Sequence, residues 1–427
     1  MVNLAKVHIW GEYAGAVLWD DSRDLASFEF DPDFRRKGWD LSPLMMPLSH
    51  TGVHSFPGLS RDTFMGLPGL LADALPDSYG KALLDRWLNA QGRTFANPVE
   101  RLCYQGKRSM GALEFEPAQD VDLESADAID VRTLVAIAAE VLNQKNSLNT
   151  NLKGNKKEAI ASIIKVSTSA GGQRAKAVIA YNEATGEIRS GQVDVPDGFT
   201  HWLLKLDGVT NKLLGDPQHF GQIEYAYYLM AVQAGLEMME CRLLEENGRS
   251  HFMTKRFDRI GSGEKVHMQT LCGLAHYDYG MKRAYSYEQA FEVMRRLRLP
   301  YPQAEQLYRR MVFNVIARNQ DDHTKNISFL MDRTGNWRLS PAYDVSWAYN
   351  PKGEWTSHHQ MSINGKWDSI TRNDLLEVST KMNIKHADEI IDSVRDAVSG
   401  WEKTALKCGV PEETVRQIEQ SLIYKEF

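Results

Sequence analysis

The segment that decides the fold is 311–350, MVFNVIARNQDDHTKNISFLMDRTGNWRLSPAYDVSWAYN. Two short apolar runs, 327–331 and 337–340, flank a Gly-containing turn and predict a β-hairpin. A hairpin brings its open ends together, so Asn326, before the first strand, and Asp344, after the second, should lie close to each other. An amide oxygen and a carboxylate are hard ligands of the kind that Mg²⁺ prefers, with waters and phosphates completing its shell. The segment therefore predicts a Mg²⁺ site at the open end of the hairpin.

The polar loop before this hairpin follows a predicted helix, 306–318, and carries Asp321 five positions before Asn326. Protein kinases use the same D-x-x-x-x-N spacing, in which the Asp accepts the proton of a substrate hydroxyl and the Asn binds a metal ion. The alternative is that these residues form an ordinary polar turn and that Asp344 caps another, since Asp and Asn are common in turns. The hairpin geometry and the upstream elements favour the catalytic interpretation.

A glycine-containing segment, 167–176 (STSAGGQRAK), lies between two predicted strands, 163–166 and 176–181. Paired glycines let backbone N–H groups approach phosphate oxygens closely. A P-loop would be followed by a helix, whereas the strand that follows here favours the glycine-rich loop of a kinase. The alternative is a plain hairpin loop. The candidate phosphate-binding residues are Ser169, Ala170, Gly171 and Gly172.

Lys205 lies between leucines in a predicted strand, 199–206 (FTHWLLKL). A lysine there costs free energy unless it has an anionic partner. Nucleotide phosphates would provide one, and Glu224 on the following predicted helix is a second candidate. The alternative is a surface lysine whose ammonium reaches solvent.

The strand HFMTKRFDR (251–259) would be the hinge between two lobes, with backbone groups near Lys255 and Phe257 holding adenine. An ordinary strand fits the same residues. His323, inside the polar loop, could contact phosphate or hydrogen-bond the loop into shape, and both interpretations stay open.

Composition excludes several classes of protein. The chain has 427 residues, 43% of them hydrophobic and 25% charged, which suggests two or three globular domains. A net charge of −6 argues against direct nucleic-acid binding by the whole chain. The four cysteines are scattered without metal-ligand spacing, so neither a disulfide framework nor a zinc site is expected. No signal peptide and no membrane-spanning apolar run is expected, which favours a cytoplasmic protein.

The order of predicted elements gives the organisation. A small α/β unit covers 1–150 and ends in a polar stretch, KNSLNTNLKGNKKE, that favours a domain boundary. A β-rich region follows over 155–260, with a hairpin around Asn247-Gly248. The remainder, 261–427, is predicted to be helical after about residue 285, apart from the hairpin described above. The fold class predicted is α+β: a two-lobed, protein-kinase-like fold with an extra N-terminal α/β subdomain.

The sequence resembles the HipA-like toxin serine/threonine kinases. The segments that carry this resemblance are STSAGGQRAK, THWLLKL, TKRFDR, NQDDHTKN and LSPAYDV, in the order found in that family. LADALPDSYGKALLDR and RSMGALEFEP extend it into the N-terminal part, so the resemblance covers nearly the whole chain. The loop GGQRAK departs from the better known AGAQEK form, and Asp322 replaces a glycine found in some members.

The resemblance implies roles for individual residues. Asp321 matches the catalytic Asp, Asn326 and Asp344 match the metal ligands, and Lys205 matches the ATP-binding lysine. His323 matches a residue near the phosphates. Ser169 matches the autophosphorylated serine of the glycine-rich loop, with Ser167 as a second candidate.

The resemblance also implies partners. A helix-turn-helix antitoxin would neutralise the toxin and bind operator DNA, so the chain would meet DNA only through that partner. The substrate would be a protein, with an aminoacyl-tRNA synthetase as one candidate. The function predicted is therefore phosphoryl transfer from ATP with Mg²⁺ to serine or threonine. Two alternatives stay open: a small-molecule kinase, and a nucleotide-responsive regulator that acts by binding a DNA-bound partner.

Overall fold

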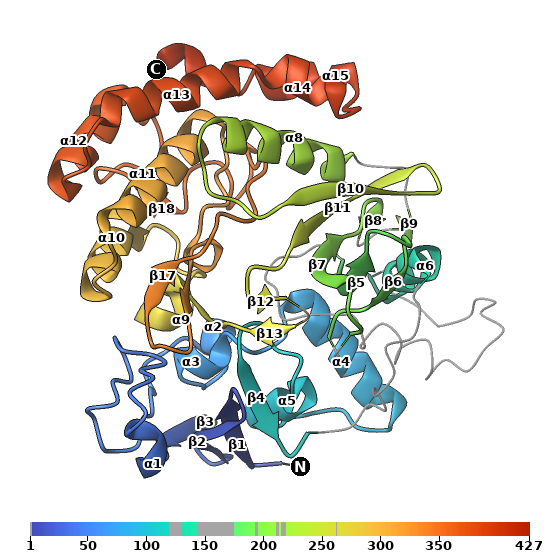
Figure 1. The fold of residues 1–427 in the computed structure, drawn as a ribbon, viewed down its shortest axis with the longest axis vertical. Helices are drawn as coiled ribbons and strands as arrows, with labels where there is room; N and C mark the ends of the chain where they lie inside the picture. The colour runs from blue at the N-terminus through green and yellow to red at the C-terminus, as the bar shows by residue number, and fades with distance from the viewer. Residues whose placement is uncertain are drawn as a thin grey trace.

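The computed structural model describes residues 2–118, 130–142, 175–192, 195–210, 213–214, 219–261 and 263–427. Within these residues the fold is mixed α/β, and the two larger sheets lie in the N-terminal and central parts while the C-terminal part is mainly helical (Figure 1). The predicted strand at 163–166 and the predicted glycine-containing loop lie outside the described residues.

The N-terminal unit, residues 2–118, is built on an antiparallel sheet with the strand order β3-β2-β1-β4. Its first two strands, β1 and β2, pair as an antiparallel hairpin. Buried and exposed side chains alternate along β1, as expected for a sheet with one face on the core. The strands are β1 (Leu4–Ile9), β2 (Glu12–Asp20), β3 (Leu25–Phe30) and β4 (Leu113–Glu116). The helices are α1 (Pro32–Arg35), α2 (Arg61–Phe64), α3 (Gly69–Ala72), α4 (Ser78–Ala90) and α5 (Pro98–Gln105).

The central part is a five-stranded sheet with the order β10-β11-β7-β5-β6 and antiparallel neighbours throughout. Asn247 and Gly248, both with positive φ, form the predicted turn between β10 and β11. The strands are β5 (Lys176–Asn182), β6 (Ile188–Ser190), β7 (Phe199–Lys205), β10 (Cys241–Glu246) and β11 (Arg249–Lys255), with a short pair β8 (Val209–Thr210) and β9 (Leu213–Leu214). The helices are α6 (Val131–Leu142) and α8 (Phe220–Gln233).

A third antiparallel sheet, β14-β16-β17, carries the predicted hairpin. Its strands are β14 (His267–Thr270), β16 (Ser328–Met331) and β17 (Trp337–Leu339), preceded by β12 (Arg259–Ile260) and β13 (Glu264–Lys265). The expectation of no further strands after residue 285 is wrong, because β15 (Tyr285–Ser286) and β18 (Met361–Ser362) form a short parallel pair.

The helical part begins with α9 (Leu271–Ala275) and α10 (Tyr287–Arg296), and α10 starts at a capping box of Ser286 and Gln289. The helix predicted at 306–318 spans Tyr301–Ile316 as α11, and its earlier start follows from the proline in its first turn. The remaining helices are η1 (Thr324–Asn326), α12 (Arg372–Met382), α13 (Ala387–Ser399), α14 (Trp401–Lys407), α15 (Glu412–Glu419) and η2 (Tyr424–Glu426). Among the described residues, no helix is both long enough and apolar enough to cross a bilayer.

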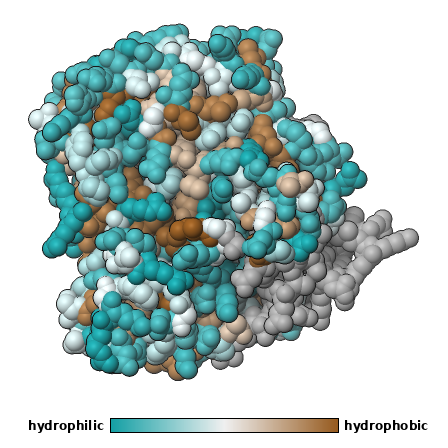
Figure 2. Space-filling model, in the orientation of Figure 1, coloured by the Kyte–Doolittle hydropathy of each residue, from teal (hydrophilic) through white to brown (hydrophobic). Residues whose placement is uncertain are grey.

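Separate apolar cores hold these parts together. The largest joins α8, α10, α11 and the C-terminal helices, and it includes the fully buried Trp401. Another fills the N-terminal unit but also contains Cys272 of α9 and Met331 of β16. The N-terminal unit is therefore packed directly against the part of the chain that carries the hairpin. In the view of Figure 2, hydrophobic side chains gather in the middle of this face, near α2 and β12 in Figure 1.

Candidate active site

The hairpin of β16 and β17 places its flanking residues as the sequence predicts. Asn326 ends η1 just before β16, and Asp344 follows β17. Between them, the Tyr343 hydroxyl donates to the Lys325 carbonyl oxygen at 2.6 Å and contacts the Ser328 hydroxyl. Asn326 and Asp344 line one cavity of about 280 Å³. The two predicted metal ligands are thus brought together by local hydrogen bonds across the open end of the hairpin.

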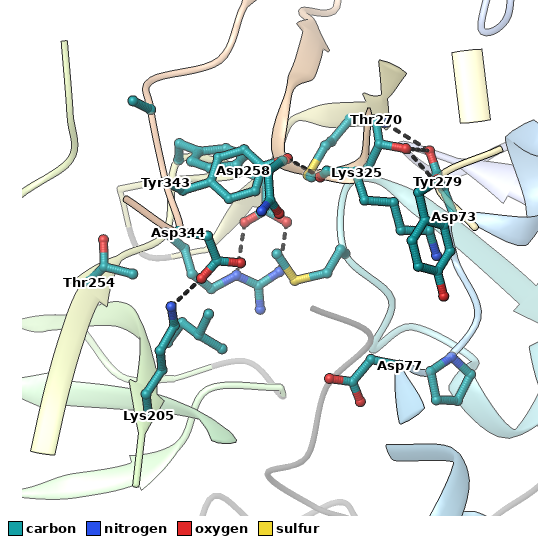
Figure 3. A pocket seen from close by; sticks show the side chains of 18 of the residues that line it. Asp73, Asp77, Lys205, Thr254, Asp258, Thr270, Tyr279, Lys325, Tyr343 and Asp344 are labelled. Atoms are coloured by element: carbon teal, nitrogen blue, oxygen red, sulfur yellow. Dashed lines mark hydrogen bonds and ion pairs between the residues drawn. The ribbon is translucent and has the colours of Figure 1, made fainter. Parts of the chain in front are cut away.

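Lys205 lies at the end of β7 with 11% of its side chain exposed, and it has two carboxylate partners. Its Nζ lies 2.5 Å from Glu224 Oε1 on α8 and also contacts Asp344 (Figure 3). Burial alone would lower the pKa of the Lys205 ammonium, but Asp344 and Glu224 together raise it above its usual value. The predicted pairing with Glu224 is confirmed, and Asp344 is a partner that the sequence did not indicate.

Asp344 has an environment suited to a permanent negative charge. Burial would raise the pKa of this carboxyl, but the charges of Lys205 and Lys176 hold it below the usual range. Lys176 stands opposite Lys205 in the pairing of β5 with β7. Two cations therefore act on the carboxylate that the sequence assigns to metal binding.

Among the predicted site residues that the structure describes, Asp321 is the most accessible, with 52% of its side chain exposed. Its carbonyl oxygen accepts a hydrogen bond from Asn326 Nδ2 at 2.7 Å, which fixes the spacing of the two residues. His323 Nε2 lies 3.8 Å from the Asp321 carboxylate, and the His323 ring packs against Tyr279 at 5.4 Å between centroids. The loop thus presents a carboxylate to solvent on a fixed backbone, as a base that receives a hydroxyl proton requires.

Asp322, beside Asp321, plays a different part. Its buried carboxylate accepts hydrogen bonds from the Tyr287 hydroxyl at 2.9 Å, His359 Nδ1 at 2.8 Å and the Gln360 N–H at 2.8 Å. It therefore fastens the 319–326 loop to α10 and to the segment after Asp344. Sequence reasoning did not find this role, because two adjacent aspartates look alike until the fold buries one of them.

The predicted hinge residues also line the cavity. Lys255 and Phe257 both face it, and the Phe257 ring lies 5.4 Å from the Tyr343 ring. The Lys255 N–H donates to the Glu240 carbonyl oxygen at 2.9 Å, so this amide serves the sheet rather than the cavity. The role of backbone groups near Lys255 and Phe257 in holding adenine stays a prediction.

One wall of the cavity was not predicted, and it comes from the N-terminal unit. Asp73 accepts hydrogen bonds from the Thr270 N–H and hydroxyl, each at 2.8 Å, and burial raises its pKa to about 6. Asp77 caps α4 and lies 3.1 Å from Lys176 Nζ. In Figure 3 these two carboxylates, with Tyr279 and Lys325, stand across the cavity from Lys205 and Asp344. Sequence separation hid this wall: more than 190 positions lie between Asp73 and Thr270.

Asn326 and Asp344 have the donor chemistry that a Mg²⁺ ion requires. The Asn326 amide nitrogen is committed to the Asp321 carbonyl, which leaves Oδ1 as the atom available to a ligand. No three His, Cys, Asp or Glu side chains form a metal-binding group within the described residues. Two protein oxygens fit an ion that takes its other ligands from phosphates and waters.

The remaining candidates cannot be placed. Ser167, Ser169, Ala170, Gly171 and Gly172 lie outside the described residues, which resume at Ala175, immediately before β5.

Comparison with known proteins identifies the family. A model of the HipA-like C-terminal domain matches residues 168–401, and a model of the HipA N-terminal domain matches residues 5–116. A chain in the solved complex of HipA, HipB and operator DNA from Shewanella oneidensis MR-1 superposes with a TM-score of 0.69. It is 17% identical, and the match covers 97% of this chain and 95% of that one, which shows a shared fold.

A curated relative gives a more limited match. Y4mE of Sinorhizobium fredii, which its name assigns provisionally to the kinases, is 26% identical over 125 residues. That match covers 27% of this chain and 30% of the relative, so it spans less than a third of the relative's length.

Proposed function

The chain belongs to the HipA family, and on that premise we propose that it is an ATP- and Mg²⁺-dependent protein kinase specific for serine or threonine. The observation that carries the proposal is the convergence of Lys205, Asn326 and Asp344 on one cavity. Asn326 also holds the backbone of the exposed Asp321 by a hydrogen bond to its carbonyl oxygen. Phosphoryl transfer depends mainly on positioning and charge stabilisation, so a cavity with these groups on fixed elements suits it.

Each residue has a proposed role. Asp321 takes the proton from the acceptor hydroxyl, whose oxygen forms the new bond to phosphorus while ADP leaves with the electrons of the broken bond. Lys205 holds phosphate oxygens, and Glu224 keeps its ammonium in place. Asn326 and Asp344 would hold Mg²⁺, which supplies neutralisation of the phosphate charge when it is bound. His323 supports the loop that carries Asp321.

Under the kinase interpretation, each part of the chain corresponds to an element of a kinase. The central sheet with α8 would be the N-lobe and the helical part the C-lobe, joined at the hinge near Lys255 and Phe257. The loop with Ser169, Ala170, Gly171 and Gly172 would cover the phosphates. Autophosphorylation at Ser169, or at Ser167, stays a prediction, as do the domain limits at 150–155 and 260.

The partners follow from the family. The solved relative from Shewanella oneidensis MR-1 is described as a toxin in complex with HipB and operator DNA. We propose that this chain also has a helix-turn-helix antitoxin that carries it to DNA, and that its substrate is a cytoplasmic protein of translation, with an aminoacyl-tRNA synthetase as one candidate.

The experiment that tests this function offers cell extract to the purified chain with γ-labelled ATP and Mg²⁺, followed by mass spectrometry. Label on serine or threonine of a protein, absent with Asp321→Asn, is the expected result. Label only on a small molecule would replace the protein substrate with a metabolite. Binding of a DNA-bound partner without transfer to any acceptor would support the regulator instead.

A further inference from the structure

Asp73 and Thr270 join the N-terminal unit to the wall of the cavity. Asp73 directly follows α3, and Thr270 immediately precedes α9. The Thr270 N–H donates to Asp73 Oδ2 at 2.8 Å, and the Thr270 hydroxyl donates to Asp73 Oδ1 at 2.8 Å. Both residues line the cavity that holds Asn326 and Asp344. One carboxylate thus fixes both the backbone and the side chain of Thr270.

Thr270 passes this constraint to α9. Its hydroxyl also accepts the Gly273 N–H at 3.0 Å and so caps α9. The next N–H, of Leu271, donates to the Ile327 carbonyl oxygen at 2.7 Å, and Ile327 directly follows Asn326. Near the other end of α9, the Thr324 hydroxyl donates to the Tyr277 carbonyl oxygen at 2.7 Å. The short helix η1, with Asn326 at its end, is therefore held on both sides by the segment around α9.

The contact between α3 and α9 leaves little freedom. A Cβ added to Gly69 would lie 2.1 Å from the Gly273 carbonyl oxygen, and one added to Gly273 would lie 2.1 Å from Asp73 Oδ2. The Gly69 N–H donates to His276 Nε2 at 3.0 Å. Because the two helices meet at backbone distance, a displacement of α3 must displace α9 as well.

We infer that Asp73 is a positioning residue for phosphoryl transfer: through Thr270 and α9 it holds Asn326 and the loop with Asp321 in their working arrangement. The effect of Asp73 on phosphoryl transfer rests on the proposed function. Its bracing of the loop does not depend on that function. The N-terminal unit is then a part of the catalytic apparatus.

A plain interface role for Asp73 makes a different prediction, and Glu114 supplies the comparison. Glu114 on β4 lies 2.7 Å from Lys265 Nζ and joins the same N-terminal unit to the rest of the chain. No hydrogen bond recorded among the described residues links this ion pair to the 319–326 loop. Asp73→Ala and Glu114→Ala therefore remove similar carboxylates from one interface, but only the first removes the support of the loop.

The first arm of the test measures amide hydrogen exchange of the full-length chain without nucleotide, in peptides covering 317–330. Asp73→Ala and Thr270→Val should accelerate exchange there at least about tenfold, because the bracing bonds are lost. Glu114→Ala should leave these peptides as in the wild type, and Thr270→Ser, which keeps the hydroxyl, should restore protection. Unchanged exchange in Asp73→Ala would overturn the inference whether or not the protein is a kinase.

The second arm measures transfer from γ-labelled ATP under saturating Mg²⁺. Asp73→Ala and Thr270→Val should lower kcat about ten- to a hundredfold with KM for ATP changed less than threefold, and Thr270→Ser should recover most of the loss. A raised KM at constant kcat, or an equal loss of kcat in Glu114→Ala, would show an interface role only. Absence of transfer in the wild type would refute the proposed function. The hydrogen-exchange result would still show whether Asp73 braces the loop.

Discussion

At the scale of single residues, Lys205 shows how a charged side chain in an apolar setting points to a functional site. A lysine between leucines on a strand predicts an anionic partner, and the structure supplies Glu224, which is 3% exposed, and Asp344, which is 27% exposed. Both carboxylates line the cavity, and Asp344 is the more exposed of the two. We therefore assign ligand binding to Asp344 and the fixing of the lysine to Glu224.

Removing the Lys205 cation should therefore reduce both stability and activity. Lys205→Met takes the ammonium from beside the buried Glu224 carboxylate, which should lower the free energy of unfolding by about 3 kcal/mol. Transfer from ATP should also be lost. Chemical denaturation and a transfer assay on the same preparation give the two values.

A double variant separates these effects. Lys205→Met with Glu224→Leu removes both buried charges, so it should recover most of the lost unfolding free energy while transfer stays absent. Recovery of transfer along with stability would show that Lys205 has no role beyond the pairing.

At the scale of elements, the contact of α3 with α9 decides where the N-terminal unit sits. Alanine is normally the better residue within a helix, yet Gly273→Ala would place a methyl group 2.1 Å from the Asp73 carboxylate. We expect a loss of about 1–3 kcal/mol in the free energy of unfolding, measured by denaturant titration. Gly58→Ala, where nothing lies within 4 Å, is the matched control and should change stability by less than about 0.5 kcal/mol. Equal behaviour of the two variants would contradict the close approach of these helices.

The same contact should weaken in acid because of His276. Burial lowers the pKa of His276 to about 4 from an ordinary 6.5, and its Nε2 accepts the Gly69 N–H only when that nitrogen carries no proton. As the pH falls from 6.5 to 4, the unfolded chain binds a proton that the folded one refuses, so the free energy of unfolding falls. Between pH 6.5 and pH 4, the protonation of His276 should lower the free energy of unfolding by about 3 kcal/mol.

The variant His276→Gln isolates this contribution from other titrating groups. Asp73 acts in the opposite direction, since its raised pKa lets the folded chain take up a proton near pH 6, before the unfolded chain does. The measurement is the difference in unfolding free energy between wild type and variant at several pH values. That difference should shrink as the pH falls from 6.5 to 4, and a difference independent of pH would contradict the assignment.

The sequence predicted those parts of the site that lie close together along the chain. The hairpin around 332–336 and the D-x-x-x-x-N spacing are local patterns, and they located Asp321, Asn326 and Asp344 within one segment. The support from Asp73 and the burial of Asp322 depend on contacts between distant segments, and no local pattern encodes them. The short β15–β18 pair was not predicted for the same reason, and each of its strands has only two residues.

At the scale of the whole molecule, the N-terminal unit meets the borders of the cavity at several places. Asp73 bonds Thr270 beside the 319–326 loop, and Asp77 lies 3.1 Å from Lys176 at the start of β5. The Gly111 N–H donates to Asp258 at 2.7 Å, just beyond the proposed hinge. Arg256 and Arg259 hold the pKa of the buried Asp258 far below its usual range, despite burial that would raise it. The unit thus contacts residues next to the proposed catalytic loop and the proposed hinge, and it also contacts the start of β5.

We propose above all that Asp321 is the base of a phosphoryl transfer. The most direct measurement is the single-turnover rate of transfer from γ-labelled ATP with Mg²⁺ for the wild type, Asp321→Asn and Asp368→Asn, an exposed carboxylate in the loop before α12. Because the Asp321 side chain is 52% exposed, its amide variant should fold and bind ATP as the wild type does. We expect a fall of at least about a thousandfold for Asp321→Asn and no change for Asp368→Asn. A rate for Asp321→Asn within a few-fold of the wild type would contradict it.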